Sequence, residues 1–122
     1  TNISAENALE KYINSYDAKF RTAYEVTINN ILKVLPKEKL LVLIFENLNQ
    51  KSFFNEINNF LNIDESKYYV SEKINTSTED LLTNINLKKK IVSNFKSTYL
   101  FCKKHFPETK KLWEGIKYLD DL

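Results

Sequence analysis

Glycine is almost missing from this sequence, since Gly115 is the single example among 122 residues. The phosphate-binding loops of Walker and dinucleotide-binding proteins need several glycines, so neither loop is present. Arginine is nearly as rare. Arg21 is the only one of the 18 basic residues that is not lysine, and forked arginine contacts to phosphate are therefore scarce. No HExxH or GxSxG motif occurs either.

Cysteine is also represented once, by Cys102. A single cysteine excludes an intrachain disulfide and a zinc site built from cysteines. It fits a reducing compartment, so a cytoplasmic protein is expected. No apolar run reaches the roughly 18 residues of a membrane-spanning helix, and the formal net charge of +2 is too small to indicate nucleic acid or a membrane as partner. A start at Thr1 rather than Met is expected of a processed chain or a piece of a longer one.

What the chain does contain is enough apolar surface for one core. Hydrophobic residues make up 43% of it and aromatic residues 13%. This composition and length predict one folded domain over residues 1–122. We expect a mainly α fold with one or two short strands.

The helices are predicted from apolar residues spaced three and four apart. Ser4 is expected to cap the first helix, Pro36 and Pro107 to end two others, and Ser77 to cap a further one. The predicted helical segments are Ala5 to Tyr16, Phe20 to Leu35, Phe53 to Leu61 (capped by Ser52 or Asn49), Ser77 to Ile85, Leu87 to Phe106 and Leu112 to Leu119.

Leu40 to Phe45 is a short, continuously apolar run bounded by charged residues. Such a run is typical of a strand buried on both faces, as in a parallel sheet, and a buried helical turn is the alternative. A strand needs neighbours, and only Tyr68 to Val70 offers one. The strand's partners are therefore expected in another segment or another chain.

The residues able to carry chemistry are few. Cys102 has His105 three residues on, but it falls in an apolar stripe, so a packed thiol is expected rather than a nucleophile, with His105 at a helix end. Glu46 directly follows the predicted strand and is interpreted as a residue that ties neighbouring loops, with a catalytic or binding role as the alternative. Lys88 to Lys90 point in different directions on a helix and are expected on solvated faces.

At this point the order of segments resembles the C-terminal part of a sulfotransferase domain. Pro36 to Leu48 reads PKEKLLVLIFENL, similar to the family's p-e-k-l-l-v-l-x-f-E-x-L. Phe60 to Ile63 is similar to the family's F-L-G-I, with Asn62 in the glycine position, where a left-handed backbone is needed. Lys73 to Ser77 resembles the family's N-x-S segment. The helices with Tyr99 and Leu112-Trp113 are similar to its last helices.

The resemblance covers about residues 20–115 and implies the C-terminal portion of a P-loop-like α/β fold. It implies sulfuryl transfer from 3′-phosphoadenosine 5′-phosphosulfate to a hydroxyl or amine. The family's phosphate loop, similar to P-K-x-G-T-T, and its catalytic base are absent from this sequence, so the chain by itself is expected to be inactive. Lys73, Asn75 and Ser77 are the candidate contacts to the donor.

Two kinds of partner follow from these interpretations. A sulfotransferase portion requires the N-terminal half of its domain. The alternative is a helical interaction module, not an enzyme, that packs its apolar faces on a partner or on a second copy of itself.

Overall fold

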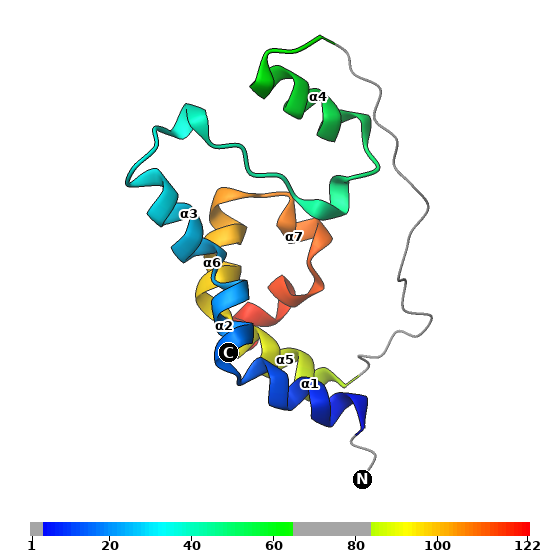
Figure 1. Ribbon diagram of the computed structural model, residues 1–122. Coiled ribbons are helices and arrows are strands. Elements are labelled where there is room, and N and C mark those ends of the chain that lie inside the picture. Colours follow the sequence, from blue (N-terminus) through cyan, green and yellow to red (C-terminus); the bar gives the residue numbers. More distant parts are fainter. Residues whose placement is uncertain (1–3, 65–83) are drawn as a thin grey trace. The chain divides into compact units, whose positions relative to one another are not determined.

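The computed structural model describes residues 4–64 and 84–122. Helices, α and 3-10 together, hold 74% of these residues, and no strand occurs among them. The mainly α class is therefore confirmed. The chain falls into two compact units, Thr1–Asn30 with Glu79–Leu122, and Ile31–Thr78 (Figure 1). A single domain over residues 1–122 stays a prediction.

The first unit begins with two short capped helices. Helix α1 (Ala5–Ile13) starts after Ser4, whose hydroxyl accepts a hydrogen bond from the Asn7 amide at 3.3 Å, which confirms the predicted cap. The helix ends three residues earlier than predicted. Ser15 then caps helix α2 (Tyr16–Thr22) by accepting a hydrogen bond from the Ala18 amide at 3.1 Å.

The predicted helix from Phe20 to Leu35 is wrong as one element, because the chain leaves the helical conformation at Ala23 (φ −75°, ψ 62°). Helix α3 (Tyr24–Leu32) follows the break. At the break the Thr22 carbonyl accepts a hydrogen bond from the Thr98 hydroxyl at 3.1 Å, while the Val26 amide donates to Ala23 instead. A side chain from a distant segment thus takes the place of one helical bond.

The C-terminal segment is also divided. The continuous helix predicted from Leu87 to Phe106 is interrupted at Phe95 (φ −115°, ψ 26°), which separates α5 (Ile85–Asn94) from α6 (Lys96–His105). Phe95 is buried in the core, and packing of its ring outweighs local helical preference. Pro107 follows the end of α6 as predicted. Helix α7 (Thr109–Leu112) and the 3-10 helix η3 (Glu114–Asp121) complete the chain.

Two groups of buried side chains form the core of this unit. The first joins Ile13 and Ala18 to Leu87 and Phe95. The second joins Val92 on α5 to Ile116, Tyr118 and Leu119 on η3. Tyr99 of α6 packs against both groups, so α6 links them.

Helices α1 and α5 lie side by side in this unit (Figure 1). Polar contacts between them include Asn84 to Glu6, Lys90 to Glu10, and Asn94 to the Ile13 carbonyl. Residue numbers rise together along both helices, so the two helices run parallel.

The second unit contains the segment predicted as a strand. After the 3-10 helix η1 (Lys37–Lys39) the backbone is extended at Leu40 (φ −123°, ψ 121°) and still extended at Ile44 (φ −91°, ψ 119°). No strand pairs with it among the described residues, and its last residue belongs to the 3-10 helix η2 (Phe45–Asn47). Leu40 to Phe45 therefore forms no strand among the described residues, because extended backbone without a ladder partner is not a strand. Its one named partner, Tyr68 to Val70, lies outside the described residues.

Helix α4 (Lys51–Leu61) begins after Gln50 rather than after the predicted caps Ser52 or Asn49. Asn62 ends it in the left-handed conformation (φ 52°, ψ 48°), as predicted from its place in the F-L-G-I pattern. The amide of Ile63 then donates to the Asn58 carbonyl at 3.0 Å, which satisfies a carbonyl that the helix end leaves open.

Candidate functional site

A partly open cavity of about 210 Å³ lies in the first unit, where α5, α6 and η3 meet. Two short sequence features build it. Gly115 lacks a side chain, and Tyr99 fills the space beside it: a Cβ added at Gly115 would lie 2.6 Å from the Tyr99 hydroxyl oxygen. The lining residues are Lys88, Ile91, Val92, Tyr99, Glu114, Gly115 and Tyr118.

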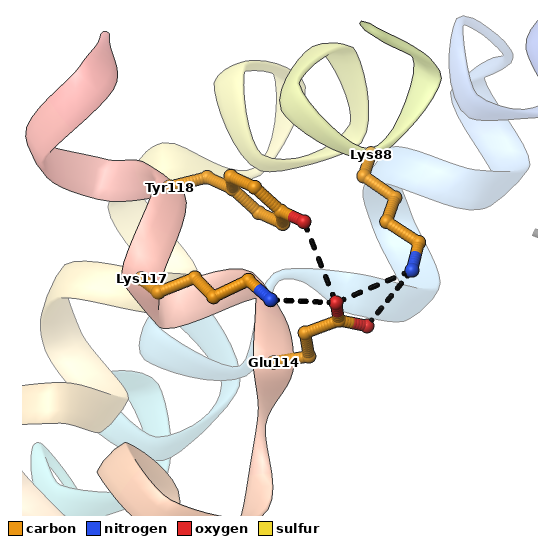
Figure 2. Close-up of polar contacts among 4 residues, drawn as sticks. All are labelled: Lys88, Glu114, Lys117 and Tyr118. Atoms are coloured by element: carbon orange, nitrogen blue, oxygen red, sulfur yellow. Dashed lines mark hydrogen bonds and ion pairs between the residues drawn. The ribbon is translucent and has the colours of Figure 1, made fainter. Parts of the chain in front are cut away.

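Glu114 is the charged centre of the cavity wall (Figure 2). Its carboxylate accepts hydrogen bonds from Lys117 Nζ at 2.8 Å and from Lys88 Nζ at 3.0 and 3.2 Å. The Tyr118 hydroxyl donates a longer one at 3.4 Å. These contacts, that from Lys117 first and that from Lys88 second, lower the pKa of Glu114 to about 2. Two ammonium groups around one carboxylate leave the cluster with net positive charge.

Lys88 to Lys90 form ion pairs in three directions. Lys88 pairs with Glu114, Lys89 with Asp121 at 3.0 Å, and Lys90 with Glu10. The prediction that the three lysines diverge is confirmed. Their expected place on solvated faces is wrong for Lys88, whose side chain is only 20% exposed.

Tyr99 supplies the least engaged polar group of the cavity. Its ring packs edge-to-face on Trp113, with centroids 6.1 Å apart. Burial raises the pKa of its hydroxyl. Within residues 4–64 and 84–122 that hydroxyl has no hydrogen-bond partner.

A second polar cluster joins α3 to α6. The Glu25 carboxylate accepts hydrogen bonds from the Ser97 hydroxyl at 2.7 Å and from the Thr98 hydroxyl at 2.6 Å. Burial acts to raise the pKa of Glu25, but these two bonds and its own backbone amide outweigh it and lower that pKa. The negative charge of Glu25 also acts on the thiol of Cys102. Burial, and then Glu25, raise the pKa of its thiol to about 11.

The described residues therefore offer no nucleophile paired with a base. Cys102 is buried, as predicted, and has a thiol that resists ionisation. His105 ends α6, also as predicted, with its ring 4.4 Å from that of Phe101. No group of three or more histidine, cysteine or acidic side chains suited to a metal occurs in residues 4–64 and 84–122.

Lys73, Asn75 and Ser77 lie outside the described residues, and Glu46 lies in η2 of the second unit. Sequence reasoning missed the cavity. Its only signals were the lone Gly115 and the spacing of Glu114 from Lys117 and Tyr118, which places them one helical turn apart.

Among the described helices, none combines the length and the apolar character needed to cross a membrane. Comparisons of the chain with protein-family models, with curated proteins and with solved structures find no match.

Proposed function

We propose that this chain is the C-terminal portion of a cytoplasmic sulfotransferase domain and does not transfer a sulfuryl group by itself. One observation carries the proposal. Leu40 to Ile44 is apolar and extended, follows α3 in the chain and precedes α4, yet no strand pairs with it in the described part of the second unit. Unpaired extended backbone is a template for another strand. In the family pattern this segment is a strand of the central sheet.

The end of α4 gives independent support. The family pattern places a glycine at the position of Asn62, and Asn62 is the one residue other than glycine with positive φ among the described residues. Left-handed backbone is also common at other helix ends, so this agreement is weaker than the extended segment. The two features lie in the order that the pattern requires.

The reaction explains why the isolated chain is inactive in this proposal. Sulfuryl transfer from 3′-phosphoadenosine 5′-phosphosulfate needs positive groups placed on the leaving phosphate. The rest of the domain supplies the phosphate loop and the base. Within this chain, Lys73, Asn75 and Ser77 are proposed to contact the donor.

Calorimetric titration with adenosine 3′,5′-bisphosphate, the spent donor, tests whether donor binding requires the rest of the domain. The folded 122-residue chain should give no heat of binding. The complete protein should bind the nucleotide, and a K73A/N75A/S77A variant of it should bind at least about tenfold more weakly, the loss expected for charge-assisted contacts. Tight binding by the isolated chain would contradict the proposal.

A second candidate is a helical interaction module that pairs with another copy of itself. Tyr16 and Phe20 on α2 favour it, because their side chains are 81% and 70% exposed and their rings stack with centroids 6.0 Å apart. Large exposed apolar groups that lie together mark interaction surfaces. Sedimentation velocity should then show a dimer that a Y16S/F20S variant converts to monomer, while V34S, at an equally exposed valine, leaves it intact. A monomeric wild-type chain would eliminate this candidate.

A further inference from the structure

The lysines of the C-terminal segment differ in how their charges are neutralised. All those of α5 and η3 form ion pairs, namely Lys88, Lys89, Lys90 and Lys117. Residues 96–111, by contrast, hold five lysines and one acidic residue, Glu108. None of the five has an ion pair within residues 4–64 and 84–122: Lys96, Lys103, Lys104, Lys110 and Lys111. The positive excess of this segment is larger than the +2 of the whole sequence, so the remaining residues are net acidic.

Leu100 on α6 lies among three of these lysines. In an α-helix the residues three and four positions away are neighbours on the same face, with Cβ atoms about 5–6 Å apart. For Leu100 these neighbours include Lys96, four residues before it, and Lys103 and Lys104, three and four residues after it. Leu100 is 47% exposed, and Lys96 and Lys104 are exposed as well. We call Leu100 with these three lysines the basic face of α6.

The basic face of α6 is turned away from the core of the first unit. The buried residues of α6, Thr98 and Cys102, lie two positions before and two positions after Leu100. At about 3.6 residues per turn, each lies about 200° around the helix from Leu100. The carboxylate that is hydrogen-bonded to α6, that of Glu25, contacts Ser97 and Thr98 and none of the three lysines. The basic face is therefore free to contact a partner.

An exposed leucine among three lysines discriminates between anionic partners. The phosphates of a nucleic acid would match the lysines but would leave Leu100 without an apolar contact. A bilayer favours helices with a wide apolar face, and Leu100 is the single apolar residue of this face. An acidic helix that carries an apolar side chain between its carboxylates matches both features. Apolar contacts flanked by pairs of lysine and glutamate are the usual arrangement between paired helices.

We propose that the basic face of α6 docks an acidic amphipathic helix of a partner protein. An apolar side chain of that helix packs on Leu100, and its carboxylates pair with Lys96, Lys103 and Lys104. A contact centred on one helix of 10 residues is small, so binding is weak, with a Kd on the order of 100 μM. The proposal is independent of the sulfotransferase assignment, because every residue that it uses lies on α6.

A designed peptide is the probe, and an NMR titration of the full 122-residue chain is the measurement. The peptide is an alanine-based helix with a central leucine and with glutamates three and four residues before and after it. We expect saturable shifts of the Leu100 and Ser97 signals, and a Kd that rises at least about fivefold between about 50 and about 500 mM salt. A peptide with glutamine in place of glutamate should bind at least about threefold more weakly. Equal binding of the glutamine peptide, or shifts that never saturate, would overturn the proposal.

Matched pairs of lysines separate the basic face from general charge attraction. K103Q/K104Q removes two charges of the face and should weaken binding of the acidic peptide about three- to tenfold. K110Q/K111Q removes the same charge from α7, outside the face, and should leave the Kd nearly unchanged. An equal loss in both variants would show attraction to positive charge in general and would refute the site.

The leucine separates a helix from the other anionic partners. L100A should weaken binding of the acidic peptide about threefold, because apolar area is lost at the centre of the contact. L112A, at a leucine of α7 that is also exposed, should leave it unchanged. If L100A does not fold, as near-ultraviolet circular dichroism would reveal, the lysine variants decide. Tighter binding to phosphatidylserine vesicles or to oligothymidylate than to the peptide, at the same salt, would overturn the choice of partner.

Discussion

The hydrogen bond from Thr98 to Glu25 joins α3 to α6, and its removal by T98V should destabilise the first unit. Thr98 is 4% exposed, and its hydroxyl lies 2.6 Å from the Glu25 carboxylate. That distance is typical of a hydrogen bond to a charged group. Valine keeps the size of the side chain but removes the donor. It also removes the longer contact, at 3.1 Å, with the Thr22 carbonyl, which shares the single hydroxyl proton of Thr98.

The size of the effect follows from what Glu25 retains. A hydrogen bond to a charged group contributes about 1.5–3 kcal/mol. Glu25 is partly exposed and keeps its bond from Ser97, so water and Ser97 compensate in part. We therefore expect T98V to lower the free energy of unfolding by about 1.5–2 kcal/mol at pH 7, in the lower part of that range.

The effect should depend on pH in a defined direction. The pKa of Glu25 is lowered in the folded chain from its ordinary 4.5, so the ionised carboxylate stabilises the fold above pH 4.5. This contribution is lost as the pH falls through the lowered pKa. The difference between T98V and the wild type should therefore shrink in acid.

Urea unfolding, followed by Trp113 fluorescence and circular dichroism, measures these quantities. T27V is the control. Thr27 is exposed and lies on α3, the helix of Glu25, so this substitution should change the free energy of unfolding by less than about 0.5 kcal/mol. In an E25Q background, T98V should cost about 1 kcal/mol less than in the wild type. The same cost in both backgrounds, or a T98V effect no larger than that of T27V, would refute the hydrogen bond as the cause.

Three further predictions concern single residues. Cys102 should react slowly with thiol reagents in the folded chain, and rapid labelling at neutral pH would contradict its burial. The free energy of unfolding should fall as the pH rises from 9.0 towards 11, because only the thiol of the unfolded chain ionises in this pH range. The carboxyl carbon of Glu114 should titrate by NMR near pH 2, and nearer to the ordinary value in K88M, while an unshifted midpoint in K88M would exclude Lys88 as a cause. N62G should raise the free energy of unfolding measured in urea by up to about 1 kcal/mol and N62A should lower it by about 1 kcal/mol, because only glycine adopts φ 52° without strain; the reverse order would contradict the left-handed backbone.

Local signals predicted the elements that depend on neighbouring residues. Ser4 caps α1, Pro107 follows the end of α6, and Asn62 ends α4, because each effect acts within one helical turn. Burial of Cys102 followed from its apolar stripe.

Other features depend on contacts between distant segments. The break at Ala23 involves a bond from Thr98, and the break at Phe95 reflects packing of its ring with residues of α1 and α2. The cavity requires α5, α6 and η3 to meet, so no single segment predicts it. Helical periodicity predicted one continuous helix from Phe20 to Leu35 and another from Leu87 to Phe106, and the structure divides both.

The sulfotransferase proposal is tested most directly on the natural polypeptide. An antibody against this chain would capture that polypeptide from its source cells, and mass spectrometry would sequence everything in the captured complex. The account predicts a phosphate-binding loop similar to P-K-x-G-T-T, either in the same polypeptide or in a stoichiometric partner, and transfer of labelled sulfate by the complex. A polypeptide without such a loop, in a complex that transfers no sulfate, would contradict it.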